Sequence, residues 1–190
     1  MKKSLCIALS FLFALLSAQR LGYTYVKTNL ALLPIAVVNV GAEFKLSDRN
    51  TFQTDILVSP WKSFAGAHAQ MLTMHAEGRH YFKEAFEGFY GGINIGGGVY
   101  NMTKWDHFGL HQYQKGYTYM AGVTLGYQCR LNRLWNLDMF AGGGIVQSQY
   151  KGYEYAPDGS VFRYDGAKGF NRSGEILPYR GGIMLSYKFR

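Results

Sequence analysis

Cysteine, long apolar runs and clustered charge are all scarce in this sequence, and each scarcity excludes a class of protein. Of the two cysteines, Cys6 falls in an N-terminal segment that we expect to be removed, so Cys129 would have no partner and a disulfide scaffold is excluded. After the first 20 residues no apolar run is long enough for a transmembrane helix. The net charge of +8 comes from scattered basic residues, whereas nucleic-acid binding needs a basic patch, so no nucleic-acid partner is expected.

Glycine and aromatic residues are abundant instead, and the side chains alternate between two types. The chain has 24 glycines, 15 tyrosines and 13 phenylalanines but only four prolines, a composition that suits curved, closely packed strands. From 117 to 150 apolar residues alternate with small or polar ones, which predicts two long strands joined by a tight turn at Asn132 and Arg133. Aromatic residues stand at the ends of the apolar set, as expected where rings lie at the level of lipid headgroups. They are Tyr117, Tyr119, Tyr127 and Trp135.

The same alternation continues along the chain and predicts eight strands in all. The two strands between 117 and 150 are of membrane length, since a tilted strand needs roughly nine to eleven residues to cross an outer membrane. The breaks between strands are short at 47–50, 83–88 and 132–134 and longer at 60–67, 101–114 and 151–176. Short periplasmic turns, longer external loops and periplasmic termini are typical of bacterial outer-membrane barrels. We therefore predict an all-β, eight-stranded antiparallel up-and-down transmembrane β-barrel, with outer-membrane lipid as its surroundings.

The N-terminus has the layout of a secretory signal peptide. Lys2 and Lys3 precede an apolar stretch over residues 5–16, and the small residues Ser17 and Ala18 follow it. We expect cleavage after Ala18, which would separate a signal peptide, 1–18, from a single outer-membrane β-barrel domain, 19–190.

Charged residues at alternating positions predict a polar interior. Glu77 and Arg79 share one face of a strand, and this face must be the interior because a charge facing lipid at mid-bilayer costs roughly 2 to 4 kcal/mol. Such an interior fits a barrel plugged by its own side chains and opposes both a pore and a soluble lipocalin-like carrier, whose interior would be apolar. The predicted interior charge network comprises Glu43, Lys45, Asp55, Glu77, Arg79, Asp138 and Arg180.

The longer loops supply the candidates for contact with a partner. The loop 151–176 combines aromatic residues with small polar ones, which is typical of a contact surface, although its tyrosines could equally pack on each other. The external-loop contact candidates are Trp105, His107, His111, Tyr153, Tyr155, Phe162 and Tyr164.

Neither a metal site nor a catalytic site stands out. His107 and His111 would share a face only in a helix, and Gly109 between them opposes one, so we expect no metal and no cofactor. Some eight-stranded outer-membrane barrels modify lipid A with a serine or histidine and a carboxylate near the outer leaflet. We see no such constellation and assign no catalytic residue, but this enzyme class remains an alternative.

Four segments together resemble a known family: 26–30, 40–44, 76–82 and 135–138. The chain is similar to a Bacteroidetes family of small outer-membrane β-barrels catalogued as a domain of unknown function, some of whose members are found near fimbrial genes. The resemblance implies a structural or interaction protein with a surface or fimbrial partner. The ending also resembles the C-terminal signal read by the barrel assembly machinery, with Tyr187 and Phe189 as its aromatic residues, although Arg190 follows the last of them.

Overall fold

The computed structural model describes residues 23–64, 66–103, 112–156, 158–164 and 171–189, and nearly all regular structure in them is β-strand. The exception is a short 3-10 turn, η2 (Leu33–Ile35), between the first two strands. No helix in the described ranges is both long and apolar enough to cross a membrane. The nine strands are β1 (Thr24–Asn29), β2 (Val38–Lys45), β3 (Asn50–Phe64), β4 (Ala67–Tyr81), β5 (Gly88–Met102), β6 (Gln112–Arg130), β7 (Trp135–Tyr155), β8 (Val161–Arg163) and β9 (Asn171–Lys188).

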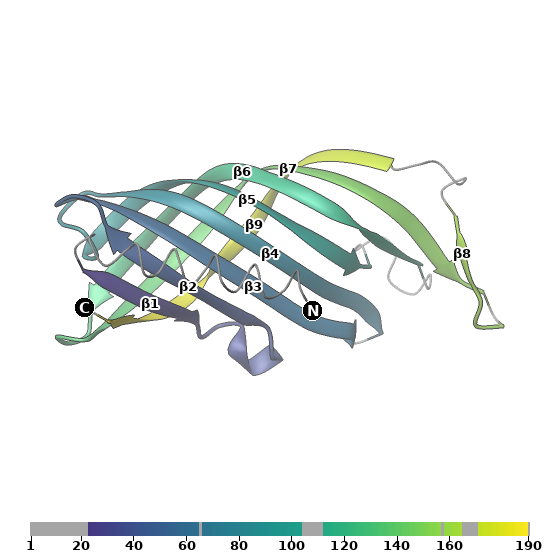
Figure 1. Ribbon diagram of the computed structural model, residues 1–190, viewed down its shortest axis with the longest axis horizontal. Coiled ribbons are helices and arrows are strands. Elements are labelled where there is room, and N and C mark those ends of the chain that lie inside the picture. The colour runs from purple at the N-terminus through teal and green to yellow at the C-terminus, as the bar shows by residue number, and fades with distance from the viewer. Residues whose placement is uncertain (1–22, 65, 104–111, 157, 165–170, 190) are drawn as a thin grey trace, which may run out of the picture.

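Eight of these nine strands form a closed ring. The strand order is β6-β5-β4-β3-β2-β1-β9-β7-β8, and β6 also pairs with β7, so only β8 lies outside the ring. Every pairing is antiparallel, and β8 pairs with β7 beyond the ends of most other strands (Figure 1). The prediction of an all-β antiparallel fold is confirmed, while the predicted count of eight strands omitted β8.

The two faces of the ring have opposite character. Outward-facing apolar side chains are widely exposed, with Ile93 74%, Leu125 69% and Phe89 67% accessible. Inward-facing charged side chains are buried, with Glu43 at 0% and Arg79 at 2%. Most globular proteins bury apolar residues and leave charged ones in water, so this ring reverses the usual arrangement.

The two ends of the ring also differ. At the turn end, short turns join β2 to β3, β4 to β5 and β6 to β7, and the described ends of the chain meet there. The backbone N–H of Lys45 donates to the carbonyl of Tyr23 at 3.1 Å, and that of Phe189 donates to the carbonyl of Thr24 at 2.9 Å. The opposite end, which we call the hairpin end, carries η2 and the β3–β4 and β7–β8 connections. At this end β1 and β2 stop early, whereas β6 and β7 extend much farther along the long axis of the ring (Figure 1).

The prediction of a loop over 60–67 is wrong, because most of this segment is β-strand. β3 continues to Phe64 and β4 begins at Ala67, so Pro60 and Trp61 lie inside β3. Pairing between β2 and β3 stops at Val58, and Pro60 therefore has only β4 as a neighbour. A proline at such an edge breaks no ladder bond on the unpaired side, and it does not end the strand.

The long loop predicted over 151–176 is also largely strand. β7 extends to Tyr155, β8 covers three residues, and β9 already begins at Asn171. Polar residues on both faces of this extension hide the apolar alternation that would have revealed it. Pro178 lies in β9 next to a β-bulge that opposes Gly142 and Gly143, a position where an interrupted ladder tolerates proline.

Candidate functional site

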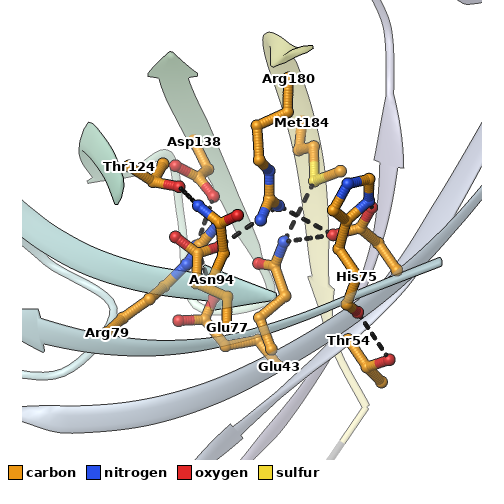
Figure 2. A network of polar contacts seen from close by, with 12 residues as sticks. Glu43, Thr54, His75, Glu77, Arg79, Asn94, Thr124, Asp138, Arg180 and Met184 are labelled. Atoms are coloured by element: carbon orange, nitrogen blue, oxygen red, sulfur yellow. Dashed lines mark hydrogen bonds and ion pairs between the residues drawn. The ribbon is translucent and has the colours of Figure 1, made fainter. Parts of the chain in front are cut away.

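The interior of the ring is held together by buried ion pairs centred on Arg79 (Figure 2). One guanidinium nitrogen, Nη1, lies 2.8 Å from Asp138 Oδ2 and 3.4 Å from Glu43 Oε2, and Nη2 lies 3.0 Å from Glu77 Oε2. These three carboxylates come from β7, β2 and β4, so Arg79 ties together strands from different sides of the ring. All four side chains are fully buried, and burial of ions is tolerated only when they are paired in this way.

Lys27 is a second cation of this interior, and the sequence prediction missed it. Its ammonium donates to Asp138 Oδ2 at 2.7 Å and to Gln53 Oε1 at 3.1 Å, and it forms an ion pair with Glu43. Its residue is only 1% exposed. Lys27 lies two residues from both Tyr25 and Asn29 in β1, so the three side chains share one face, and all three are buried. This spacing was the signal in the sequence that could have placed Lys27 in the interior.

Tyrosine hydroxyls complete the hydrogen bonding around the carboxylates. The Tyr90 hydroxyl donates to Asp138 Oδ1 at 2.8 Å, and the Arg79 guanidinium lies 4.4 Å from the centre of the Tyr90 ring. The Tyr81 hydroxyl lies 2.8 Å from Glu43 Oε1 and 2.7 Å from Gln128 Oε1. Hydrogen bonds to ionised groups are stronger than neutral ones, so these contacts stabilise the charged form of the network.

A second layer of the network lies towards the hairpin end and is built around Asp55. Arg180 Nη2 lies 2.9 Å from Asp55 Oδ1 and 3.2 Å from Glu77 Oε2, so it links this layer to the one around Arg79. Asn39 donates to Asp55 Oδ2 at 3.2 Å, and His75 Nδ1 lies 3.6 Å from the same oxygen. Figure 2 shows Arg180, Glu77 and His75 of this layer pointing into the interior of the ring.

The β-bulge in β9 explains how two consecutive residues both reach this layer. Arg180 pairs with Gly142 and Pro178 with Gly143, which leaves Tyr179 as the extra residue. Tyr179 donates to Asn94 Oδ1 at 2.5 Å and stacks on His75, while Arg180 contacts Asp55. Re-aiming a side chain is a common use of bulges.

We define the interior charge network as Lys27, Glu43, Asp55, Glu77, Arg79, Asp138 and Arg180. It contains six of the seven residues predicted from the sequence and replaces the seventh, Lys45, by Lys27. Four carboxylates face three permanent cations, and every member has at least one oppositely charged partner.

Lys45 does not belong to this network, and its assignment is corrected. It is the last residue of β2, where the interior opens at the turn end, and its side chain is 31% exposed. There it pairs with Asp48 at 3.2 Å.

In the neighbouring turn the ammonium of Lys83 donates a hydrogen bond to Glu87, which lowers the pKa of that carboxyl.

The external-loop contact candidates have varied positions. Trp105, His107 and His111 lie outside the described residues. Tyr153 and Tyr155 lie in β7 and Phe162 in β8, so they belong to strands and not to a loop. Tyr164 packs its ring against Gly152 and lies 3.4 Å from Gln114 Nε2.

Two of these tyrosines form part of a stacked aromatic cluster at the hairpin end, which comprises His68, Tyr113, Tyr153 and Tyr155. The ring centres lie 4.4 Å apart for His68 and Tyr113 and 5.3 Å apart for Tyr113 and Tyr153. The Tyr155 hydroxyl lies 3.3 Å from His68 Nε2. Within the segment 151–176, Tyr153 and Tyr155 therefore pack on neighbouring rings, as one of the two interpretations of this segment expected. Tyr155 is still 39% exposed and is available for contact.

The outer face of the ring carries aromatic residues near the turn end and aliphatic residues next to them in the direction of the hairpin end. Phe89 packs on Tyr127 at 4.8 Å between ring centres, and Trp135 packs on Tyr187 at 4.9 Å. Phe189, the other aromatic residue of the predicted assembly signal, is 73% exposed at the same end. Aliphatic side chains with large exposed fractions follow on the neighbouring positions of the same strands, among them Ile93, Ile95, Val123, Leu125 and Ile145.

One comparison with known proteins identifies the family. A protein-family model described as "Protein of unknown function (DUF3575)" matches residues 5–187, almost the whole chain. The chain belongs to this family. No curated protein and no solved structure matches it.

The described part of this DUF3575 chain contains no group of three or more histidine, cysteine, aspartate or glutamate side chains placed to hold a metal ion. Among the described residues, His75 lies beside the carboxylate of Asp55 inside the ring, and their side chains are 4% to 5% exposed. Asp55 is already bound by Arg180 and Asn39, so its arrangement is that of a structural ion pair.

Proposed function

We propose that the protein is a small β-barrel of the bacterial outer membrane with a structural or interaction role, presenting its hairpin end to a partner on the cell surface. A single observation carries the proposal: a closed ring with a charged, paired interior is covered outside by exposed apolar side chains. In a bilayer a closed sheet satisfies all its backbone hydrogen bonds, and outward apolar residues face hydrocarbon.

The energetics favour a lipid environment for the outer face. Ile93, Leu125 and Phe89 are each about two-thirds exposed or more. Burying such a side chain fully is worth roughly 1.5 to 3 kcal/mol, so a ring covered with them gains strongly from leaving water. The aromatic residues near the turn end match the belt expected at a membrane interface.

The proposed orientation has the turn end in the periplasm. Short turns and both ends of the described chain lie there, and Tyr187 and Phe189 stand beside them as the signal for the barrel assembly machinery. Residues 1–18 would be the cleaved signal peptide. The hairpin end, with Tyr155 and Phe162 exposed, would face the outside and meet an envelope or fimbrial partner.

Two alternatives receive less support. A soluble lipocalin-like carrier would need an apolar interior and a polar exterior, the reverse of this ring. An enzyme acting on lipid A would need a reactive group near the outer leaflet, and the Asp55–His75 pair is instead enclosed by other interior side chains.

Membrane insertion is tested by extraction and electrophoresis. The protein should require detergent for extraction and should run differently on a gel before and after boiling, because a folded barrel resists the detergent of the gel. Recovery of the folded protein in the soluble periplasmic fraction without detergent would overturn the proposal.

Orientation is tested by labelling single cysteines in a Cys129→Ser background. Asp158→Cys places a thiol in the β7–β8 turn, and Asp48→Cys places one in an exposed turn at the turn end. A maleimide that cannot cross membranes should label the first variant on intact cells and the second only after lysis. The opposite pattern would reverse the orientation and end the proposal of an external hairpin end.

A further inference from the structure

The hydrogen-bonded wall of the ring is incomplete towards the hairpin end. β1 pairs with β9 as far as Met184, where Leu30 adds a last bond to Ile183, and β2 pairs with β3 as far as Val58. Both β9 and β3 continue beyond these positions (Figure 1). Because β1 and β2 separate β9 from β3 at the turn end, the interval left open is two strands wide. No other described strand pairs across this interval, which we call the wall gap.

Two bonds at the end of β9 show which way its backbone groups point. The N–H of Lys188 donates to the carbonyl of Leu134 at 2.7 Å, and that of Phe189 donates to the carbonyl of Thr24 at 2.9 Å. In an antiparallel strand the direction alternates, so even-numbered residues here face β7 and odd-numbered ones face β1. The bulge adds Tyr179 as an extra residue and so reverses this order. Beyond the bulge, the backbone groups of even-numbered residues therefore point away from β7 and into the wall gap.

These residues form the open edge of β9, which we define as Arg172, Gly174, Ile176 and Pro178. The first three offer both an N–H and a carbonyl, and Pro178 offers only a carbonyl. The N–H that proline lacks would have faced the wall gap, so Pro178 leaves the ladder with β7 intact. A proline on an open edge limits the strands that can pair with it, so this edge favours a selected partner.

Part of the open edge lies at the depth of the hydrocarbon layer if the ring is inserted as proposed. Outward positions of β7 are apolar or small from Trp135 to Ile145 and polar from Gln147 onwards. Ile176 is the register partner of Ile145 and is 83% exposed. Its edge-facing N–H and carbonyl would therefore meet lipid, which offers no hydrogen bonds, and open sheet edges do not occur in that layer. Membrane insertion thus requires a cover for this edge.

The directions of the flanking strands indicate the shape of the cover. Backbone groups at strand spacing are matched by another strand. β9 runs towards the turn end and β3 runs away from it, so antiparallel neighbours of the two would run in opposite directions. One β-hairpin supplies two such strands and fills the two-strand interval. Its turn would lie beside η2, where Trp61 Nε1 donates to the carbonyl of Ile35 at 2.7 Å, and its two ends would leave at the hairpin end.

We propose that the wall gap is the docking site for a β-hairpin of an extracellular partner protein. One strand of this hairpin bonds to Arg172, Gly174 and Ile176 and sets an apolar side chain beside Ile176 on the lipid-facing side. A second copy of this chain is a poorer occupant, because antiparallel pairing of two β9 edges would turn one copy upside down in the membrane. The assignment rests on the proposed membrane insertion and names the kind of surface that the partner presents.

The test uses the full chain folded in detergent micelles, and it measures amide exchange by NMR and binding of a probe. The probe is a synthetic, disulfide-closed β-hairpin of alternating valine and threonine. The proline variant is Arg172→Pro with Ile176→Pro, which removes two N–H groups that face the wall gap and spares the bonds to β7. The alanine variant, Arg172→Ala with Ile176→Ala, removes the same side chains but keeps both N–H groups.

Without the probe, the edge amides of wild type should exchange rapidly. Those of Arg172, Gly174 and Ile176 should exchange about a hundredfold faster than those of Ser173 and Glu175, which face β7. Slow exchange at the open edge of the protein alone would mean that the chain covers its own edge, and this result would overturn the proposal.

With the probe, the three edge amides should become protected. The alanine variant should bind the probe about tenfold more tightly than the proline variant, because each hydrogen bond contributes roughly two- to tenfold in affinity. Equal binding by the two variants would show that side chains or the micelle hold the probe, and no binding or protection elsewhere would remove the hairpin site. A dimer in native mass spectrometry that the proline variant dissociates would assign the edge to a second copy. Each of these results overturns the proposal.

Insertion is checked separately by the heat-dependent gel shift, which wild type and both variants should show. A shifting protein whose edge amides stay unprotected rejects the hairpin site alone. A wild-type protein that shows no shift rejects the membrane insertion on which the site depends.

Discussion

Replacing Arg79 by alanine is the most direct test of the interior charge network. The side chain is fully buried and contacts the carboxylates of Asp138, Glu77 and Glu43 at 2.8, 3.0 and 3.4 Å. Its removal leaves four buried carboxylates facing two permanent cations, Lys27 and Arg180. Each carboxylate keeps one partner, but each remaining cation is then shared by two of them.

Removing one partner of a buried ion pair typically costs about 3 to 5 kcal/mol, because the other charge is left uncompensated. We expect Arg79→Ala to lower the free energy of unfolding by this amount. With a denaturant slope of about 2 kcal/mol per M, the urea midpoint should fall by roughly 1.5 to 2.5 M. Glu77→Gln combined with Arg79→Met removes one charge of each sign and should unfold at a higher urea concentration than Arg79→Ala alone.

The assay is urea unfolding of the protein refolded in detergent micelles. Arg130→Ala is a matched control, because Arg130 is 52% exposed and pairs with Glu84 and Glu87 at 3.5 and 3.4 Å at the turn end. Such surface pairs contribute about 0 to 1 kcal/mol, so this variant should unfold close to the wild-type midpoint. A wild-type midpoint for Arg79→Ala would refute the reasoning, because it would mean that the side chain is exposed or unpaired.

Two further predictions concern the packing of the interior and the enzyme alternative. In Gly126→Ala the added methyl group would collide with the Tyr90 ring, so we expect the free energy of unfolding, measured with urea, to fall by about 1 to 3 kcal/mol. Gly78→Ala is the control and should be tolerated, because nothing lies within 4 Å of the added methyl group. Equal urea midpoints for the two variants would contradict the close packing. Replacing His107 and His111 together by alanine should leave the lipid A of the envelope unchanged by mass spectrometry, and a lost acyl modification would favour the enzyme.

The sequence alone determined the faces of the strands and the short turns. Alternation is a local property, because successive side chains of any strand point to opposite sides. The inward direction of Glu77 and Arg79 and the turns near 48, 85 and 133 therefore followed without knowledge of strand neighbours. The same rule failed at the extended end of β7, where polar residues lie on both faces, and at β8, where three residues are too few to show an alternation.

Only the tertiary structure decided which charges meet. Lys27 and Asp138 are 111 residues apart, and their contact depends on the register of several strand pairs and on closure of the ring. The β9 bulge turns Tyr179 and Arg180 inward together, which no periodic pattern predicts. Register also puts Lys115 opposite Lys151. These contacts are non-local, since each depends on the accumulated stagger of the strands between the residues, whereas the face of each residue is set by its neighbours in the chain.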